Sequence, residues 1–350
     1  MGELLPLARL HPAVRAWTAG GSRSARAPWT VAFSGGADSL ALLLLLWAHW
    51  PERRARLRVL HFNHRLRGRA ADADEHFCRR VCAALGLRVG VGRWQRRRRD
   101  ASEEEARAAR FAFFDRAMRR AGARALWLGH HEDDVAETML MRLARGSGTA
   151  GLAAPRPVQR VERRLHLRPL LTLKKATILA SLRAAGASWR EDRTNAAGGF
   201  FRNRIRREVV PAWLKAAGRD AVAGAACARQ LLEEDDEALE TWLDALHPLG
   251  PRGASLNVAA LTGRPRALLR RALRRWLAAQ PLAGQISRQG FEDLLGVVAA
   301  GRPARRSLGK KGFAVLRDGI LRFARIRLRG GSRRNRAQPE SLRHRATRLN

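Results

Sequence analysis

The sequence is poor in the residue types on which several classes of protein depend. Its 350 residues include no tyrosine and only three cysteines, and no CxxC pair occurs. This absence argues against enzymes that carry a catalytic cysteine pair or a cysteine-held iron–sulfur cluster. Cys78 and Cys82 stand four residues apart, which predicts two buried thiols on one helix face. Unpaired thiols of this kind fit a reducing cytoplasm, and we expect a cytoplasmic location.

Long apolar runs are also missing. The longest, Leu40–Trp50, spans 11 residues and contains His49. A membrane-spanning helix needs about 20 apolar residues, so we expect no contact with a membrane. Residues 1–27 are rich in Arg and Ala and contain no secretory apolar stretch. We interpret them as a short helix and a linker, with an organelle transit peptide as the alternative.

Acidic residues and lysine are scarce, whereas arginine is abundant. The chain has 68 basic and 31 acidic residues, a formal net charge of +37. Only five of the basic residues are lysines, which leaves 63 arginines. A GC-rich coding bias accounts for arginine in place of lysine, but less well for the excess of base over acid. The excess predicts a polyanionic partner such as RNA.

In the first half of the chain, short apolar runs alternate with helical patterns. This alternation is typical of an α/β fold with a Rossmann-like parallel sheet. We predict strands near residues 30–33, 58–62, 88–91, 125–129 and 164–170, with helices near 38–50, 71–85, 102–122, 133–144 and 174–185.

From about residue 216 the pattern becomes mostly helical, which predicts a second, smaller domain. Helices are expected at 221–246, 265–279 and 291–299. A hairpin is expected around Arg317-Asp318-Gly319, because a DG turn between short apolar runs favours one. We therefore divide the chain into four parts. Residues 1–27 form an N-terminal helix and linker, and residues 28–215 form a catalytic domain. Residues 216–328 form a helical domain that we expect to bind tRNA, and residues 329–350 form a basic tail that we expect to lack fixed structure.

The stretch VAFSGGADSLALLLLL, residues 31–46, places polar residues and glycines between two apolar runs. Gly35 and Gly36 allow a ligand to approach the backbone closely. The helix that follows offers oriented N–H groups and a partial positive charge to an anion. No GxxxxGK[ST] pattern occurs in the chain, and this stretch does not have the form GxGxxG. The stretch is thus either a plain strand-to-helix turn or a phosphate loop of another type.

Ser34-Gly35-Gly36-Ala37-Asp38-Ser39 resembles the SGGxDS loop of the N-type ATP pyrophosphatases, or PP-loop enzymes. These enzymes cleave ATP between the α- and β-phosphates and adenylate a substrate. Further stretches follow in order: HFNHRLRG at 61–68, EEEARAARFAFF at 103–114, HHEDDVAETMLMRLARGSGTAGL at 130–152, RPLL at 168–171 and RNRIR at 202–206. The series resembles the tRNA(Ile)-lysidine synthase family over about residues 28–215 and more weakly to about 325.

The segment HHEDDVAET carries clustered carboxylates at an expected strand end. Asp134 and Glu137 stand three apart and share one face of a helix. The pattern HExxH is absent because residue 135 is Val, which excludes that type of zinc site. Clustered carboxylates beside a phosphate loop suit Mg²⁺ or a cationic amine. Simple capping of a helix by acids is the structural alternative.

The resemblance assigns a role to each matching residue. It implies that residues 34–39 bind ATP, that Asp38 also helps to hold Mg²⁺, and that Arg110 acts at the reacting centre. Asp134 and Glu137 would recognise the ammonium groups of L-lysine and, with Asp38 and Arg110, form the catalytic set. The basic stretch with Arg202, Asn203 and Arg206, which follows two phenylalanines, would contact tRNA.

The resemblance implies a ligase that converts ATP to AMP and pyrophosphate. The product would be lysidine, with lysine joined to carbon 2 of the wobble cytidine of an isoleucine tRNA with a CAU anticodon. It also implies a homodimer. Two alternatives stay open: another PP-loop enzyme, such as a tRNA thiolase, and a non-catalytic RNA-binding protein.

Overall fold

The computed structural model describes residues 1–20, 27–66, 68–95, 102–191, 201–281, 286–309 and 312–325. Contacts divide the chain into two compact units, Met1–Glu237 and Ala238–Asn350. The division falls inside helix α11 (Ala221–Ala245), later than the expected boundary at residue 216. The first part of α11 packs its Val222 and Ala225 against helix α6, which accounts for the difference. The expected tail at 329–350 lies outside the described residues.

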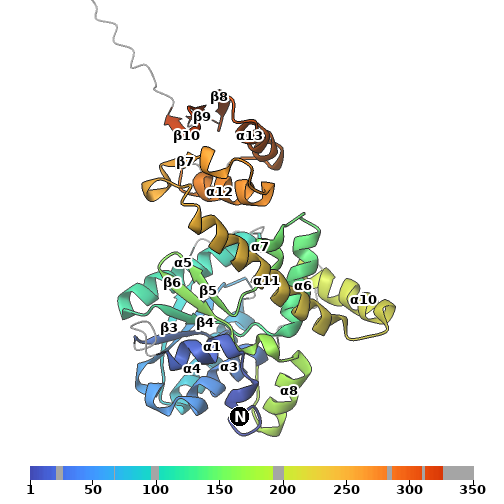
Figure 1. Ribbon diagram of the computed structural model, residues 1–350. Coiled ribbons are helices and arrows are strands. Elements are labelled where there is room, and N and C mark those ends of the chain that lie inside the picture. Colours follow the sequence, from blue (N-terminus) through green and yellow to red (C-terminus); the bar gives the residue numbers. More distant parts are fainter. Residues whose placement is uncertain are drawn as a thin grey trace, which may run out of the picture. The chain divides into compact units, whose positions relative to one another are not determined.

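The first unit is built on a six-stranded sheet with the order β3-β2-β1-β4-β6-β5 (Figure 1). Neighbours among the first five strands in this order are parallel, which confirms the predicted parallel sheet. The strands are β1 (Trp29–Ala32), β2 (Leu57–Asn63), β3 (Arg88–Arg93), β4 (Ala125–Trp127), β5 (Val158–Val161) and β6 (Arg164–Leu167). The sequence does not predict β5, a four-residue edge strand that pairs antiparallel with β6. The segment VQRV is too short to show the alternation of apolar and polar residues that predicts a strand.

The helices of this unit include α1 (Pro12–Ala19), α3 (Ala37–His49), α4 (Arg69–Ala84), α5 (Glu103–Ala121), α6 (Glu132–Leu143), α7 (Thr149–Leu152), α8 (Lys175–Ala184), α9 (Phe201–Arg204) and α10 (Val210–Ala217). Five of them, α3, α4, α5, α6 and α8, begin and end close to the residues predicted for them, whereas the bounds of α1, α7, α9 and α10 are not predicted. The strongest boundary signal belongs to α5. Its Ser102 and Glu105 form a capping box, and Gly122 ends the helix in a left-handed conformation.

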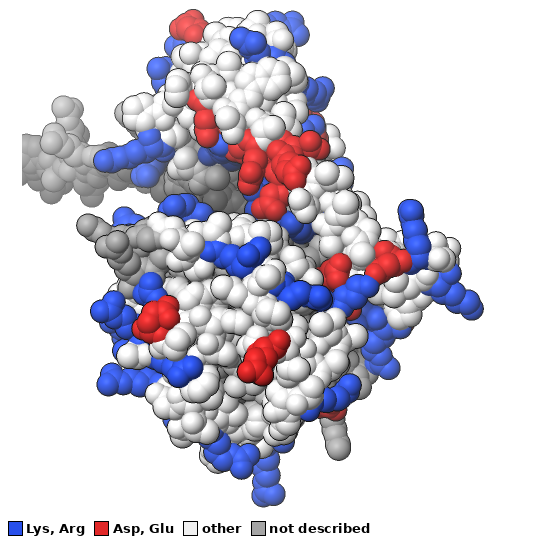
Figure 2. Space-filling view, turned by 60° about the horizontal axis from the view of Figure 1, so that its bottom comes forward, with Lys and Arg blue, Asp and Glu red and all other residues white. Residues whose placement is uncertain are grey.

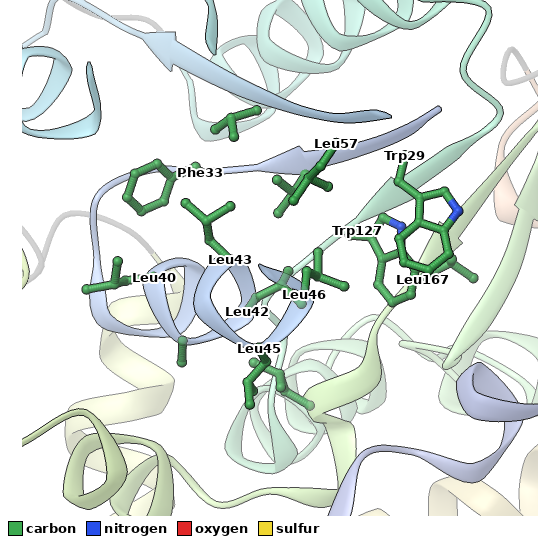
Figure 3. Close-up of a cluster of buried hydrophobic side chains, with 14 of the residues drawn as sticks. Trp29, Phe33, Leu40, Leu42, Leu43, Leu45, Leu46, Leu57, Trp127 and Leu167 are labelled. Atoms are coloured by element: carbon green, nitrogen blue, oxygen red, sulfur yellow. The ribbon is translucent and has the colours of Figure 1, made fainter. Parts of the chain in front are cut away.

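Successive side chains of the strands point to opposite faces of the sheet and pack into two separate hydrophobic cores. Val31, Val59 and Trp127 face the larger core, which α1, α3, α4 and α8 cover. Leu60 and Leu126 point to the opposite face and pack against α5. Figure 3 shows the leucines of α3 packed among Trp29, Trp127 and Leu167. The buried apolar side chains of α3 hold the start of this helix firmly against the end of β1.

The second unit contains a four-stranded antiparallel sheet with the order β7-β10-β9-β8 and two packed helices. The predicted hairpin is confirmed as β9 (Gly312–Arg317) and β10 (Ile320–Arg325). The other elements are β7 (Ser255–Asn257), β8 (Ala304–Ser307), α12 (Arg266–Ala278) and α13 (Arg288–Ala300). The sequence does not predict β7 or β8, because one is three residues long and the other reads ARRS without apolar alternation.

Basic side chains spread widely over the surface, whereas acidic ones occupy a few separate patches in the view of Figure 2. This distribution agrees with the net charge of +37. In the part of the chain that the structure describes, no helix has the length and apolar character that a membrane crossing requires.

Candidate active site

The phosphate loop connects the end of β1 to the start of α3. Gly36 is the N-cap residue of α3, and no side chain caps the helix there. The Ser39 hydroxyl donates to the Gly36 carbonyl oxygen at 3.0 Å and accepts from the backbone N–H of Ser34 at 3.1 Å. These bonds close the loop on itself. The first backbone N–H groups of a helix have no carbonyl partner within the helix, so the start of α3 can bind an anionic ligand.

Gly35 is the one loop residue whose conformation demands glycine. Its φ is +90°, and a Cβ built there would lie 3.3 Å from both the Cys78 Sγ and the Phe77 ring. Gly36, in contrast, has φ −74°, and its Cβ would meet only the Ser34 hydroxyl, at 3.5 Å, and the backbone oxygen of Arg190, at 3.9 Å. The two glycines, although adjacent, differ in what they tolerate.

We therefore expect Gly35→Ala to lower the free energy of unfolding by about 1–2 kcal/mol, because a left-handed backbone strains any L-side chain. Gly36→Ala is the matched control and should change it by less than about 0.5 kcal/mol. Urea denaturation of the two variants measures the difference. Equal losses would show that the loop conformation does not distinguish the two positions.

The segment after β4 brings a second group of polar residues to the same edge of the sheet. A Cβ on Gly129 would lie 2.9 Å from the Asp38 carbonyl oxygen, so the end of β4 touches the backbone of α3. His131 then lies between the two segments. Its Nε2 is 3.7 Å from Asp38 Oδ2 and 3.5 Å from Asp134 Oδ2. The loop and the start of α6 thus form one continuous site.

Asp134 and Glu137 are buried near the start of α6, with only 7% and 2% of each residue exposed. Two arginines neutralise them. Arg202 donates from Nη2 to Asp134 at 2.7 Å and from Nε to Glu137 at 2.8 Å. Arg206 donates to both carboxylate oxygens of Glu137, at 2.5 and 3.0 Å. The two acids predicted to bind L-lysine are therefore paired with two arginines predicted to contact tRNA.

The electrostatics of this group keep Asp134 ionised. Burial alone would raise the pKa of Asp134, but the charges of His131 and Arg202 outweigh it and hold that pKa at about 2. Burial would likewise lower the pKa of His131, but the Asp133 carboxylate, 3.3 Å from its Nδ1, and the charges of Asp134 and Asp38 raise it. The raised pKa favours the protonated, positively charged form of His131, which lies between the loop and α6.

His130, its neighbour, is held neutral. Burial lowers the pKa of His130 to about 3, which outweighs the nearby Asp134 charge. Arg168 donates from Nε to His130 Nδ1 at 3.2 Å, so Nδ1 is an acceptor and the proton is carried on Nε2. Arg168 is itself buried and also donates to the Gln159 side chain at 3.0 Å. The contact with Arg168 thus fixes the neutral His130 ring, whose Nε2–H is a hydrogen-bond donor.

Two further residues, Arg110 and Asn203, are predicted from the resemblance. Arg110 is on α5, with its guanidinium carbon 5.6 Å from the centroid of the Phe111 ring. Asn203 lies in the short helix α9, between Arg202 and Arg204. Within the described residues, no three or more His, Cys, Asp or Glu side chains gather into a metal site. Asp38 is the one carboxylate among loop residues 34–39.

Two residues of the site have no role predicted from the sequence. Lys175 donates from Nζ to Asp38 Oδ1 at 2.5 Å across 137 positions of the chain. Arg168, next to Pro169, orients His130. RPLL contributes to the family resemblance without assigning a role to Arg168, and nothing local in TLKKATI marks Lys175. Neither contact follows from periodicity or spacing.

The fold and this site are those of a PP-loop protein: the family model of the PP-loop domain matches residues 14–213. Three relatives have the same name, tRNA(Ile)-lysidine synthase. Those of Geobacter sulfurreducens and Symbiobacterium thermophilum are 40% and 37% identical over 75% and 73% of this chain. That of Chlorobaculum tepidum is 33% identical over 84% of this chain and 89% of its own length. The chain belongs to the tRNA(Ile)-lysidine synthase family.

The chain spans 57% and 55% of the length of the first two relatives. The activity and the substrates of the complete relatives are therefore only proposed for this chain.

Proposed function

We propose that the protein is an ATP-dependent ligase that joins L-lysine to the wobble cytidine of an isoleucine tRNA with a CAU anticodon. The observation that carries the proposal is the buried pair Asp134 and Glu137 beside an SGGxDS loop, in a chain of this family. The loop supplies N–H donors for phosphate, and the acids supply a site for a cationic amine. A large excess of basic residues suits a tRNA partner.

The proposed reaction has two steps. In the first, an oxygen of the cytidine base attacks the α-phosphate of ATP, the bond between the α- and β-phosphates breaks, and pyrophosphate leaves. In the second, the ε-amine of lysine attacks carbon 2 of the adenylated base and AMP leaves. Free lysine has an amine pKa of about 10.4, so the amine must lose a proton before it attacks.

The residues divide between these steps. Residues 34–39 bind the phosphates, and Asp38 would hold Mg²⁺ that accompanies ATP. Magnesium is usually bound by one or two carboxylates together with phosphate oxygens, and a single loop carboxylate fits that pattern. Arg110 stabilises charge at the reacting centre. Asp134 and Glu137 bind lysine, while Arg202, Asn203 and Arg206 contact tRNA.

The pairing of Arg202 and Arg206 with the acids adds a requirement to this scheme. Lysine reaches Asp134 and Glu137 only when the arginines release them. Phosphate groups of the tRNA are the anions that would receive the guanidinium groups, because arginine pairs strongly with phosphate. Lysine and tRNA binding would therefore be coupled.

The tRNA thiolase alternative is not favoured. Burial raises the pKa of the Cys78 thiol, and it raises that of Cys82 to about 11. Both thiols are therefore protonated at neutral pH and poor nucleophiles. Reduced, buried thiols also suit the proposed cytoplasmic location.

Incorporation of radiolabelled lysine into a CAU-bearing isoleucine tRNA transcript, with purified protein and magnesium ATP, tests the function. We expect label in the tRNA. No label, with ATP–pyrophosphate exchange still dependent on tRNA, would retain an adenylating enzyme and reject lysine as its substrate. No label and no use of ATP would favour the RNA-binding alternative.

A further inference from the structure

Lys175 is the first residue of α8, and it is bound by both halves of the site. Its ammonium donates to Asp38 Oδ1 at 2.5 Å, and Asp38 belongs to the phosphate loop. Its backbone N–H donates to Asp133 Oδ2 at 2.9 Å, and Asp133 lies in the first turn of α6. The backbone of Lys175 is thus anchored, whereas its side chain reaches across to the loop.

The pair of Lys175 and Asp38 differs from the other pairs of the site in its access to solvent. Their side chains are 35% and 30% exposed, whereas those of Asp134 and Glu137 are at most 10% exposed. Lysine has a flexible stem and a compact charge, so its ammonium can move by a few ångströms without disturbing the backbone. A ligand that enters the loop from solvent can therefore reach this ammonium.

We propose that Lys175 is a phosphate-binding residue, which neutralises Asp38 in the free protein and binds the triphosphate of ATP when it enters the loop. The inference rests on the proposed function in that ATP is the ligand. A triphosphate has more negative charge than one carboxylate and offers several acceptor oxygens, so it outcompetes Asp38 for the ammonium. Release of Asp38 would also free its carboxylate for the cation that accompanies ATP.

The neighbouring residue provides a built-in comparison. Lys174 forms an ion pair with Asp220, and these side chains are 47% and 42% exposed. Lys174 has the same charge and lies one residue away, but its partner lies just before α11 rather than in the loop. Loss of Lys174 removes one positive charge from the same region without touching the loop carboxylate.

Binding of ATP to Lys175→Met, Lys175→Arg and Lys174→Met, measured by calorimetry with magnesium chloride and without tRNA, tests the proposal. We expect Lys175→Met to raise the Kd for ATP about tenfold or more, because a charged hydrogen bond to phosphate is lost. Lys175→Arg should keep the Kd within about threefold, since the charge remains. Lys174→Met should leave the Kd unchanged, and the dependence of the Kd on salt should be weaker only in Lys175→Met.

A purely structural role for Lys175 would give a different result. Melting temperatures without ATP would then fall in Lys175→Met, while the Kd of the folded protein stayed at the wild-type value. That outcome, or equal losses of affinity in Lys174→Met and Lys175→Met, would overturn the proposal. Wild-type protein that fails to bind ATP would instead reject the proposed function itself.

A measurement on the wild-type protein avoids any variant that fails to fold. An amine-reactive reagent should modify Lys175 at least several-fold more slowly when ATP is present, because its amine is then covered by phosphate. Modification of Lys174 serves as the internal reference and should keep its rate. Equal rates at Lys175 with and without ATP would contradict the proposal.

Discussion

Glu137→Gln is expected to abolish lysine transfer while leaving the adenylation step in place. The residue is 2% exposed and receives hydrogen bonds from Arg202 and Arg206. Glutamine preserves its shape but removes the charge that would hold the ammonium of lysine. We expect lysine incorporation to fall at least about 100-fold, which corresponds to about 2.7 kcal/mol of lost binding in the transition state.

The measurement compares two readouts of the same protein. Labelled lysine entering tRNA reports the second step, whereas tRNA-dependent ATP–pyrophosphate exchange reports the first and should stay within about threefold of wild type. Glu132→Gln is the matched control, because Glu132 begins the same helix and should be tolerated in both assays. A loss of exchange equal to the loss of lysine transfer would show that Glu137 supports the whole site rather than the lysine.

Arg206→Ala is expected to strengthen lysine binding in the absence of tRNA and to weaken binding of tRNA. The Arg206 side chain is 44% exposed, and Arg202 remains to hold both acids after its removal. Fold and burial should therefore survive. If tRNA recruits these arginines from the acids, tRNA raises the affinity of the wild-type protein for lysine, by about 5- to 150-fold for a typical coupling.

Equilibrium dialysis with labelled lysine, with and without tRNA, measures that coupling. In Arg206→Ala, the lysine Kd without tRNA should fall at least about fivefold, and tRNA should change it less. Arg204→Ala removes the same charge from the same segment, where the guanidinium lies over the Phe201 ring, and should retain the wild-type coupling. Weaker lysine binding in Arg206→Ala would mean that the arginine supports the lysine site instead of covering it.

A sequence reveals contacts between residues that are close in the chain. The loop at residues 34–39 and the acids of α6 can be predicted because each is local: a strand end, a turn and the first helical turns lie within a few residues. Their meeting at one edge follows from the parallel sheet, which the alternation of short apolar runs and helices predicts.

The partners of the acids could not be predicted in the same way. Arg202 meets Glu137 across 65 positions, and Lys175 meets Asp38 across 137. With 63 arginines in the chain, no pattern of residue types selects the two that turn inward. Such pairs depend on how α9 and α8 pack onto the sheet, which periodicity does not specify. The edge strand β5 is not predicted for a related reason: it forms by pairing with β6 in a hairpin, and its own four residues show no strand pattern.

The close approach of Gly129 to the backbone of Asp38 affects the interval between the two steps of the proposed reaction. No side chain fits between this residue and the backbone of α3, so main-chain atoms set the distance from the phosphate loop to the carboxylate helix. A spacing that main-chain atoms set does not vary with side-chain rotamers. Under the proposed function, an activated base formed at one segment stays within reach of the nucleophile held by the other. Such an intermediate has little time in which water can destroy it.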